Sequence, residues 1–171
     1  MLDEPFGAEL TVTRCGELPF NELQQLMARY GLALERVDDE QSIPGSFWGD
    51  AEAGIILRRV LIRDDTPVHS FLHEACHLIC MDEERRSQLH TDSGGDYAEE
   101  DAVCYLQVVL SDWLPGYGRT KMLTDMDTWG YSFRLGSAAA WFDADAADAR
   151  AWLLQHKLLD ASHHPLWGLR Y

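Results

Sequence analysis

The 171-residue sequence predicts an α+β fold in which a small, twisted, mostly antiparallel sheet packs on one central helix. Three observations support this prediction. Residues 54–63 are rich in β-branched and apolar side chains, residues 68–79 have helical apolar spacing, and a second such helix opens at 97–101. The 46% of hydrophobic residues can form a core without disulfides. We expect one domain over residues 1–171, with its motif-bearing core at about 45–112 and a helical part at about 118–171.

The segments that precede this core predict short strands and one helix, so that the order is β-α-β-β-β followed by helices. They are a strand at 10–13, a helix from Asn21 to Tyr30 that Gly31 ends, and strands at 32–37, 46–48 and 54–63. The short link at 49–54 predicts a hairpin between the last two strands. The free edge of the 54–63 strand could bind an extended peptide by strand addition.

The central helix carries the most informative motif of the chain. Thr66 is expected to cap this helix and Pro67 to occupy its first position. Val68, Phe71, Leu72, Ala75, Leu78 and Ile79 then form an apolar face at three- and four-residue spacing. On the edge of that face, residues 73–77 read H-E-x-x-H.

The H-E-x-x-H spacing indicates a metal site of the kind that activates water. His73 and His77 are four residues apart, so both imidazoles can reach one ion from the same helix face. Glu74 can direct its carboxylate at a water on that ion, as a general base. These residue types favour Zn²⁺, which needs a third protein ligand and an open position for water.

The third ligand is expected at the start of the helix that begins with the acidic run 97–101. Glu99 is the preferred candidate, because it shares a face with Val103 and Leu106 and burying a carboxylate there is costly without a partner. Glu100 lies to one side of this face, and the choice between Glu99 and Glu100 stays open. His90 and Asp92 rank lower, because a loop positions side chains less firmly.

These two motif helices resemble the gluzincin metallopeptidases, with the small ImmA/IrrE-like proteases as the closest comparison. The resemblance covers about residues 45–112 and implies a zincin-like fold, bound zinc and hydrolysis of peptide bonds. It places the ligand glutamate on Glu99 and the family phenylalanine on Tyr105. The chain departs from the family at Val103, where Asn or Asp is usual, and at Cys76, where glycine is common.

A peptidase mechanism needs a hydrogen-bond donor for the tetrahedral intermediate besides the metal. Tyr131 is the candidate we select from the loop-like segment 129–134, and Glu74 is the general base. Other candidates remain open, namely Arg134, His156, His163 and His164. His69 also lies on the histidine face but is expected to be a packed core residue, because three ligands are already supplied.

Composition limits the partners that we expect. The net charge of −15 opposes binding of a nucleic-acid backbone, no apolar run is long enough for a membrane span, and the opening residues lack an export-signal pattern. Four cysteines without C-x-x-C spacing then suggest reduced thiols and a cytoplasmic location. The expected partner is a peptide or protein substrate, with the oligomeric state open. The alternative is a zincin-like zinc-binding regulatory or interaction module without peptidase activity.

Overall fold

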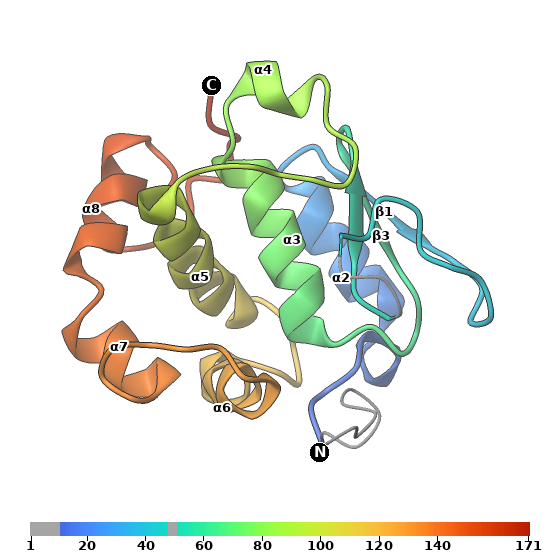
Figure 1. Cartoon of the computed structure of the whole chain (residues 1–171), viewed down its shortest axis with the longest axis horizontal. Coiled ribbons are helices and arrows are strands. Elements are labelled where there is room, and N and C mark those ends of the chain that lie inside the picture. The colour runs from blue at the N-terminus through green and yellow to red at the C-terminus, as the bar shows by residue number, and fades with distance from the viewer. Residues whose placement is uncertain (1–10, 48–50) are drawn as a thin grey trace.

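The computed structural model describes residues 11–47 and 51–171 and has an α+β architecture (Figure 1). In chain order its elements are η1 (Cys15–Glu17), α2 (Phe20–Ala28), β1 (Ala33–Arg36), β2 (Gly54–Ile56), β3 (Arg59–Ile62), α3 (Val68–Cys80), α4 (Glu83–Arg86), α5 (Tyr97–Ser111), α6 (Arg119–Trp129), α7 (Ala138–Ala144) and α8 (Ala147–Gln155). None of the described helices is long and apolar enough to cross a membrane.

The sheet has three strands in the order β1-β3-β2 and is mixed. β1 runs parallel to β3, with Ala33 opposite Arg59, whereas β2 and β3 are antiparallel. The prediction of a mostly antiparallel sheet is therefore wrong. β2 lies between β1 and β3 in the sequence but pairs with the opposite edge of β3. The chain therefore returns through β2 before β3 runs in the same direction as β1.

Residues 54–63 form a hairpin and not the single strand that was predicted. Leu57 and Arg58 make the turn between β2 and β3, with Leu57 at a φ of 53°. The outer edge of β2 is already occupied, since Ile55 N donates to Gly45 O and Leu57 N donates to Leu89 O. Thr91 N also donates to Ile55 O. A peptide therefore cannot add to this edge without displacing those bonds, and the expected strand-addition site is wrong.

Helix α3 lies at the centre of the molecule, between the sheet and α5 (Figure 1). It also packs on α6, and all but one of its thirteen residues are buried. The predicted cap is wrong: Pro67 occupies the N-cap position, and the Thr66 hydroxyl accepts a hydrogen bond from Arg63 N at 2.9 Å. The helix that carries the motif is thus held by packing on several sides, which fixes its side chains firmly.

The N-terminal predictions are confirmed in part. α2 begins at Phe20, one residue before the expected start at Asn21, and the chain turns at Gly31 with a φ of 72°. The strand expected at 32–37 is β1. Residue 10 lies outside the described residues, and 11–13 form no strand. Of the strand expected at 46–48, residue 48 lies outside the described residues and Ser46 makes a single bridge to Gly54.

The C-terminal part contains more helices than were predicted. The helical part expected at about 118–171 is formed by α6, α7 and α8, and the single helical pattern that residues 137–159 suggest is divided into α7 and α8 by a break at Asp145–Ala146. The last residues dock against the C-terminal end of α3, where Arg170 N donates to Ile79 O at 3.0 Å. Trp167 packs there on Tyr30, with ring centroids 5.3 Å apart.

Gly54 is predicted to be intolerant of any side chain. A Cβ at this position would lie 2.1 Å from Pro44 O and 2.7 Å from Ser46 N, both of them backbone atoms. Gly54→Ala should therefore lower the free energy of unfolding by about 1–3 kcal/mol, as overpacking does. Urea denaturation checks this, with Gly168→Ala as the control because open space surrounds Gly168. Equal stability of the two variants would contradict the close approach of Gly54 to the backbone of Pro44 and Ser46.

Candidate metal centre

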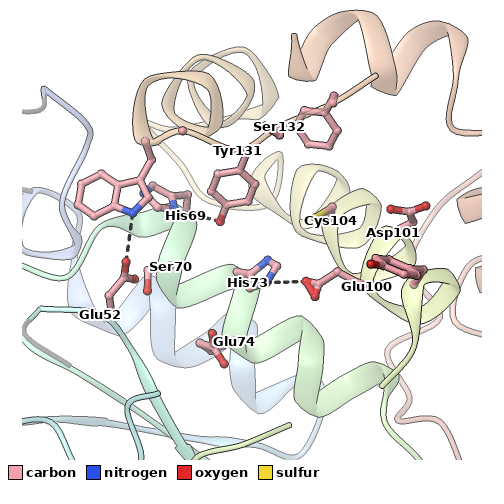
Figure 2. Close-up of a pocket in the computed structure, with 14 residues that line it drawn as sticks. Glu52, His69, Ser70, His73, Glu74, Glu100, Asp101, Cys104, Tyr131 and Ser132 are labelled. Carbon is pink, nitrogen blue, oxygen red and sulfur yellow. Dashed lines mark hydrogen bonds and ion pairs between the residues drawn. The ribbon is translucent and has the colours of Figure 1, made fainter. Parts of the chain in front are cut away.

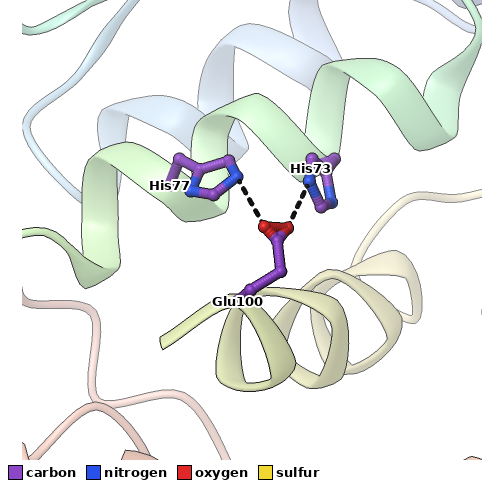
Figure 3. Close-up of side chains that lie close together, drawn as sticks. All are labelled: His73, His77 and Glu100. Carbon is purple, nitrogen blue, oxygen red and sulfur yellow. Dashed lines mark ion pairs between the residues drawn. The ribbon is translucent and has the colours of Figure 1, made fainter. Parts of the chain in front are cut away.

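Two histidines of α3 and one glutamate of α5 converge at a single point (Figure 3). His73 Nε2 lies 3.0 Å from Glu100 Oε1, and His77 Nε2 lies 3.3 Å from Glu100 Oε2. The two imidazole rings are nearly perpendicular, at 86°, with centroids 4.7 Å apart. The predicted convergence of the two H-E-x-x-H histidines is thus present in the structure.

The donor set fits a zinc ion. Zinc binds imidazole nitrogen and carboxylate oxygen at about 2.0–2.2 Å, so neighbouring ligands of a tetrahedral site lie roughly 3.3 Å apart. The observed nitrogen–oxygen separations match that spacing, and one donor atom from each residue can be chosen so that all lie within 4.8 Å of one another. Three protein ligands leave one position open, as a catalytic zinc site requires.

The carboxylate beside the histidines belongs to Glu100, so the placement predicted for Glu99 is wrong. Glu99 is buried on another side of α5, where Arg85 donates to both of its oxygens, at 3.1 and 2.5 Å. Arg170 donates to Oε1 at 3.1 Å. The cost of burying Glu99 is therefore offset by two guanidinium groups and not by a metal.

Glu99 was wrongly predicted as the ligand because α5 is buried on nearly all of its sides. Every residue from Ala102 to Ser111 is buried, since the helix contacts α3, α6 and α8. An apolar stripe then does not identify the face that points to the histidines, and adjacent residues differ in direction by about 100°. The two arginines that stabilise Glu99 come from α4 and from the C-terminus, which sequence spacing could not relate to it.

Gln107 orients His73 from behind. His73 Nδ1 lies 2.6 Å from Gln107 Oε1, and Gln107 Nε2 donates to the His69 carbonyl at 3.3 Å. The second bond turns the amide oxygen toward His73, so the imidazole must donate from Nδ1. Nε2 is then the nitrogen left to face Glu100 and a metal, which is the arrangement that second-shell partners impose on zinc ligands.

The two histidine ligands differ in the support that neighbouring side chains give them. His77 Nδ1 is buried and has no hydrogen-bond partner among the described residues. With Glu100 facing the histidines, the residue four positions later is Cys104 and not Val103. Cys104 interacts with His73, and burial raises the pKa of its thiol. Support for the ligands therefore rests on the His73 side of the pair.

The electrostatics of the group favour a cation between the three side chains. Hydrogen bonds from His73 and His77 outweigh the burial of Glu100 and hold its pKa well below the usual range. Burial opposes a charge on His73, but the contacts to Tyr131, Cys104 and Glu100 outweigh it and raise the pKa of His73. A metal ion that binds Nε2 of His73 competes with a proton for that nitrogen.

Glu74 and Tyr131 border the same cavity as His73 (Figure 2). The cavity has a volume of about 660 Å³. Burial raises the pKa of Glu74, whose side chain nonetheless reaches the cavity. The Tyr131 hydroxyl lies 3.2 Å from His69 Nδ1, and burial raises its pKa, so that it remains a proton donor. Both predicted catalytic residues are thus positioned at the site, although their roles stay predictions.

The other candidates from the sequence lie elsewhere. Arg134 pairs with Asp145, and the His156 ring packs at a tilt of 32° against Trp152, with ring centroids 3.9 Å apart; neither residue borders the cavity. The remaining two, His163 and His164, lie beside Asp160. His69 is buried as expected, and burial, with a smaller contribution from His73, lowers its pKa to about 3.

The two loop residues considered as rival ligands lie outside the donor group, whereas one residue that supports the site was not predicted. His90 bonds to Thr91 and Asp92 to Gly94 N, and neither belongs to the group of three donors. Gln107 was not predicted, although it interrupts the apolar run 106–110 two helical turns after Glu100.

No protein-family profile, curated protein or solved structure matches the chain.

Exchanging each carboxylate for its amide should separate the roles of Glu99 and Glu100. Glu99→Gln should lower the free energy of unfolding of the metal-free chain by about 2–4 kcal/mol, because Arg85 and Arg170 lose a buried partner while staying partly solvated. Glu100→Gln should change it by less than about 1 kcal/mol, as for a half-exposed pair, but abolish zinc binding. Urea titrations and metal analysis of both variants measure this. Zinc retained by Glu100→Gln would contradict the assignment.

Removing the acceptor behind His73 should weaken metal binding. Gln107→Leu keeps the side-chain volume but cannot accept from Nδ1, so zinc affinity should fall about 10–100-fold. Gln107→Glu retains an acceptor oxygen and should recover most of that affinity. Competition with a chromophoric chelator measures both values. If Gln107→Leu binds zinc as tightly as the unmodified chain, the amide does not orient the ligand.

Proposed function

We propose that the chain is a zinc-dependent peptidase in which His73, His77 and Glu100 hold the metal. The observation that carries this proposal is the convergence of the three donors beside Glu74, at the wall of an open cavity. A site with only a structural role would have a closed set of four ligands and no need of an adjacent base. The order of strand, H-E-x-x-H helix and glutamate helix supports a zincin-like fold and a gluzincin-type peptidase.

The proposed mechanism assigns one task to each side chain. Bound zinc supplies Lewis acidity and a water whose pKa is lowered toward neutrality. Glu74 takes the proton of the attacking water and later gives it to the leaving amine. Burial raises the pKa of Glu74, which suits this exchange, because a stronger base takes the proton of the water more readily.

Tyr131 is proposed to stabilise the tetrahedral intermediate. Its ring packs 5.8 Å from that of His73, and its hydroxyl is directed into the space between His69 and His73 (Figure 2). The hydroxyl can turn from His69 to a substrate oxygen, and its raised pKa keeps the proton in place for donation. Gln107 and the packing of α3 hold the ligands still during the reaction.

The surroundings proposed for the protein follow from its charge and its thiols. All four cysteines are unpaired and buried, which supports a reducing compartment such as the cytoplasm. The net charge of −15 supports a peptide or protein substrate and opposes a nucleic-acid one. The alternative interaction module predicts the same metal site without hydrolysis, so only an activity measurement separates the two.

Replacement of the base tests the peptidase proposal directly. Glu74→Gln should retain one zinc per chain and lower peptide hydrolysis about 10²–10⁴-fold, because proton transfer is lost while the ligands remain. Zinc content and cleavage of a broad peptide library are measured on the same preparations. Glu84→Gln, an exposed change of the same charge, serves as the control. Absence of hydrolysis by both the unmodified chain and the control would favour the interaction module.

A further inference from the structure

The site opens into two cavities of unequal size. The larger, about 660 Å³, lies toward α6 and the segment that follows it, and the smaller, about 180 Å³, lies toward the loop at 91–94. His73, Glu74 and Glu100 border both. A peptide that crosses the site therefore places the residues on one side of the cleaved bond in a much larger space than those on the other side. The composition of the larger cavity should select the side chain that it receives.

The larger cavity is acidic. Besides Glu74 and Glu100, it is lined by Glu52 and Asp101, and none of its lining residues in the described parts of the chain is lysine or arginine. His69, which also lines it, is neutral near physiological pH, since burial lowers its pKa to about 3. Glu100 is engaged by the two histidines and Glu74 serves the water. Glu52 and Asp101 are the carboxylates left to interact with a bound side chain.

Glu52 is the better placed of these two. The indole nitrogen of Trp129 donates to its Oε1 at 3.1 Å, which anchors the carboxylate at the cavity wall (Figure 2). Its Oε2 has no donor among the described residues, and the side chain is half-buried, so that water screens it only in part. Asp101 is exposed, so water and salt screen its charge and a bound cation would gain less from it.

The remaining wall suits a long aliphatic stem. Four aromatic residues line the cavity, and three of them, Trp129, Tyr131 and Phe133, come from the end of α6 and the segment after it. Lysine and arginine bury their methylene groups on such rings while their charged ends reach a carboxylate, and cation–π attraction adds to this. A negatively charged side chain would meet Glu52, and no lysine or arginine of the described residues lines the cavity to offset that repulsion. The overall charge of −15 also attracts basic peptides to the protein.

We propose that the larger cavity binds a lysine or arginine side chain of the peptide substrate, and that Glu52 is the residue that selects it. This inference rests on the proposed peptidase function, because it assigns the substrate position next to the cleaved bond. Glu52 forms the ion pair, and the three aromatic rings pack on the alkyl stem. The smaller cavity accepts a less bulky residue on the opposite side of the bond.

The test compares peptides that differ at one position only, lysine against norleucine, which has a similar stem and no charge. With the zinc-loaded full chain, kcat/KM should favour lysine by about tenfold or more at one position beside the cleaved bond. Glu52→Gln should reduce this ratio to about twofold or less, while Glu84→Gln keeps it. An unchanged ratio in Glu52→Gln, or a ratio that collapses only in Asp101→Asn, overturns the assignment.

A binding measurement separates this inference from the peptidase proposal. Zinc-loaded Glu74→Gln should bind the lysine peptide about tenfold more tightly than the norleucine peptide, with the preference lost in Glu52→Gln/Glu74→Gln. If no peptide is cleaved but this preference is found, the cationic site stands and the peptidase proposal fails. If peptides are cleaved without any lysine preference, the cationic site fails and the peptidase proposal stands.

Discussion

The rotation of α5 about its own axis is the constraint on which the metal centre depends. Three acidic residues follow one another at 99–101, and only one of them can face the histidines of α3 at a time. The ion pairs of Glu99 with Arg85 and Arg170 hold one side of the helix, and its apolar residues pack on the others. Glu100 is thereby directed at His73 and His77.

This constraint connects the C-terminus to the site. Arg170 bonds to Glu99 and to the Cys80 carbonyl, so the last residues join the start of α5 to the end of α3. Arg86, fully buried, donates to the carbonyls of Leu78, Met81 and Arg170 and completes the same junction. The aromatic C-terminal segment thus stabilises the geometry of the ligands from the far side of α3 and does not cover the cavity.

The sequence predicted what local chemistry determines and missed what remote packing determines. The α3 helix, the convergence of its two histidines and the helix with a glutamate near its start follow from spacing that one segment contains. The choice between Glu99 and Glu100 could not follow, because Arg85 and Arg170 lie 14 and 71 residues away from Glu99. Similarly, the turn at Leu57 has no glycine or asparagine to mark it, so β2 and β3 were taken as one strand.

Glu99 and Glu100 have different roles, which explains how one acidic helix start can both stabilise the fold and supply a metal ligand. Glu99, buried and doubly paired, holds the helix in place, whereas the Glu100 side chain remains 42% exposed and pairs with His73 and His77, so that a metal ion can bind between the three groups. A carboxylate that served both purposes would be bound to arginine too tightly to serve as a ligand. The same separation applies on α3, where Gln107 orients His73, whereas the Glu74 side chain has no hydrogen-bond partner among the described residues and is available to the water it is proposed to activate.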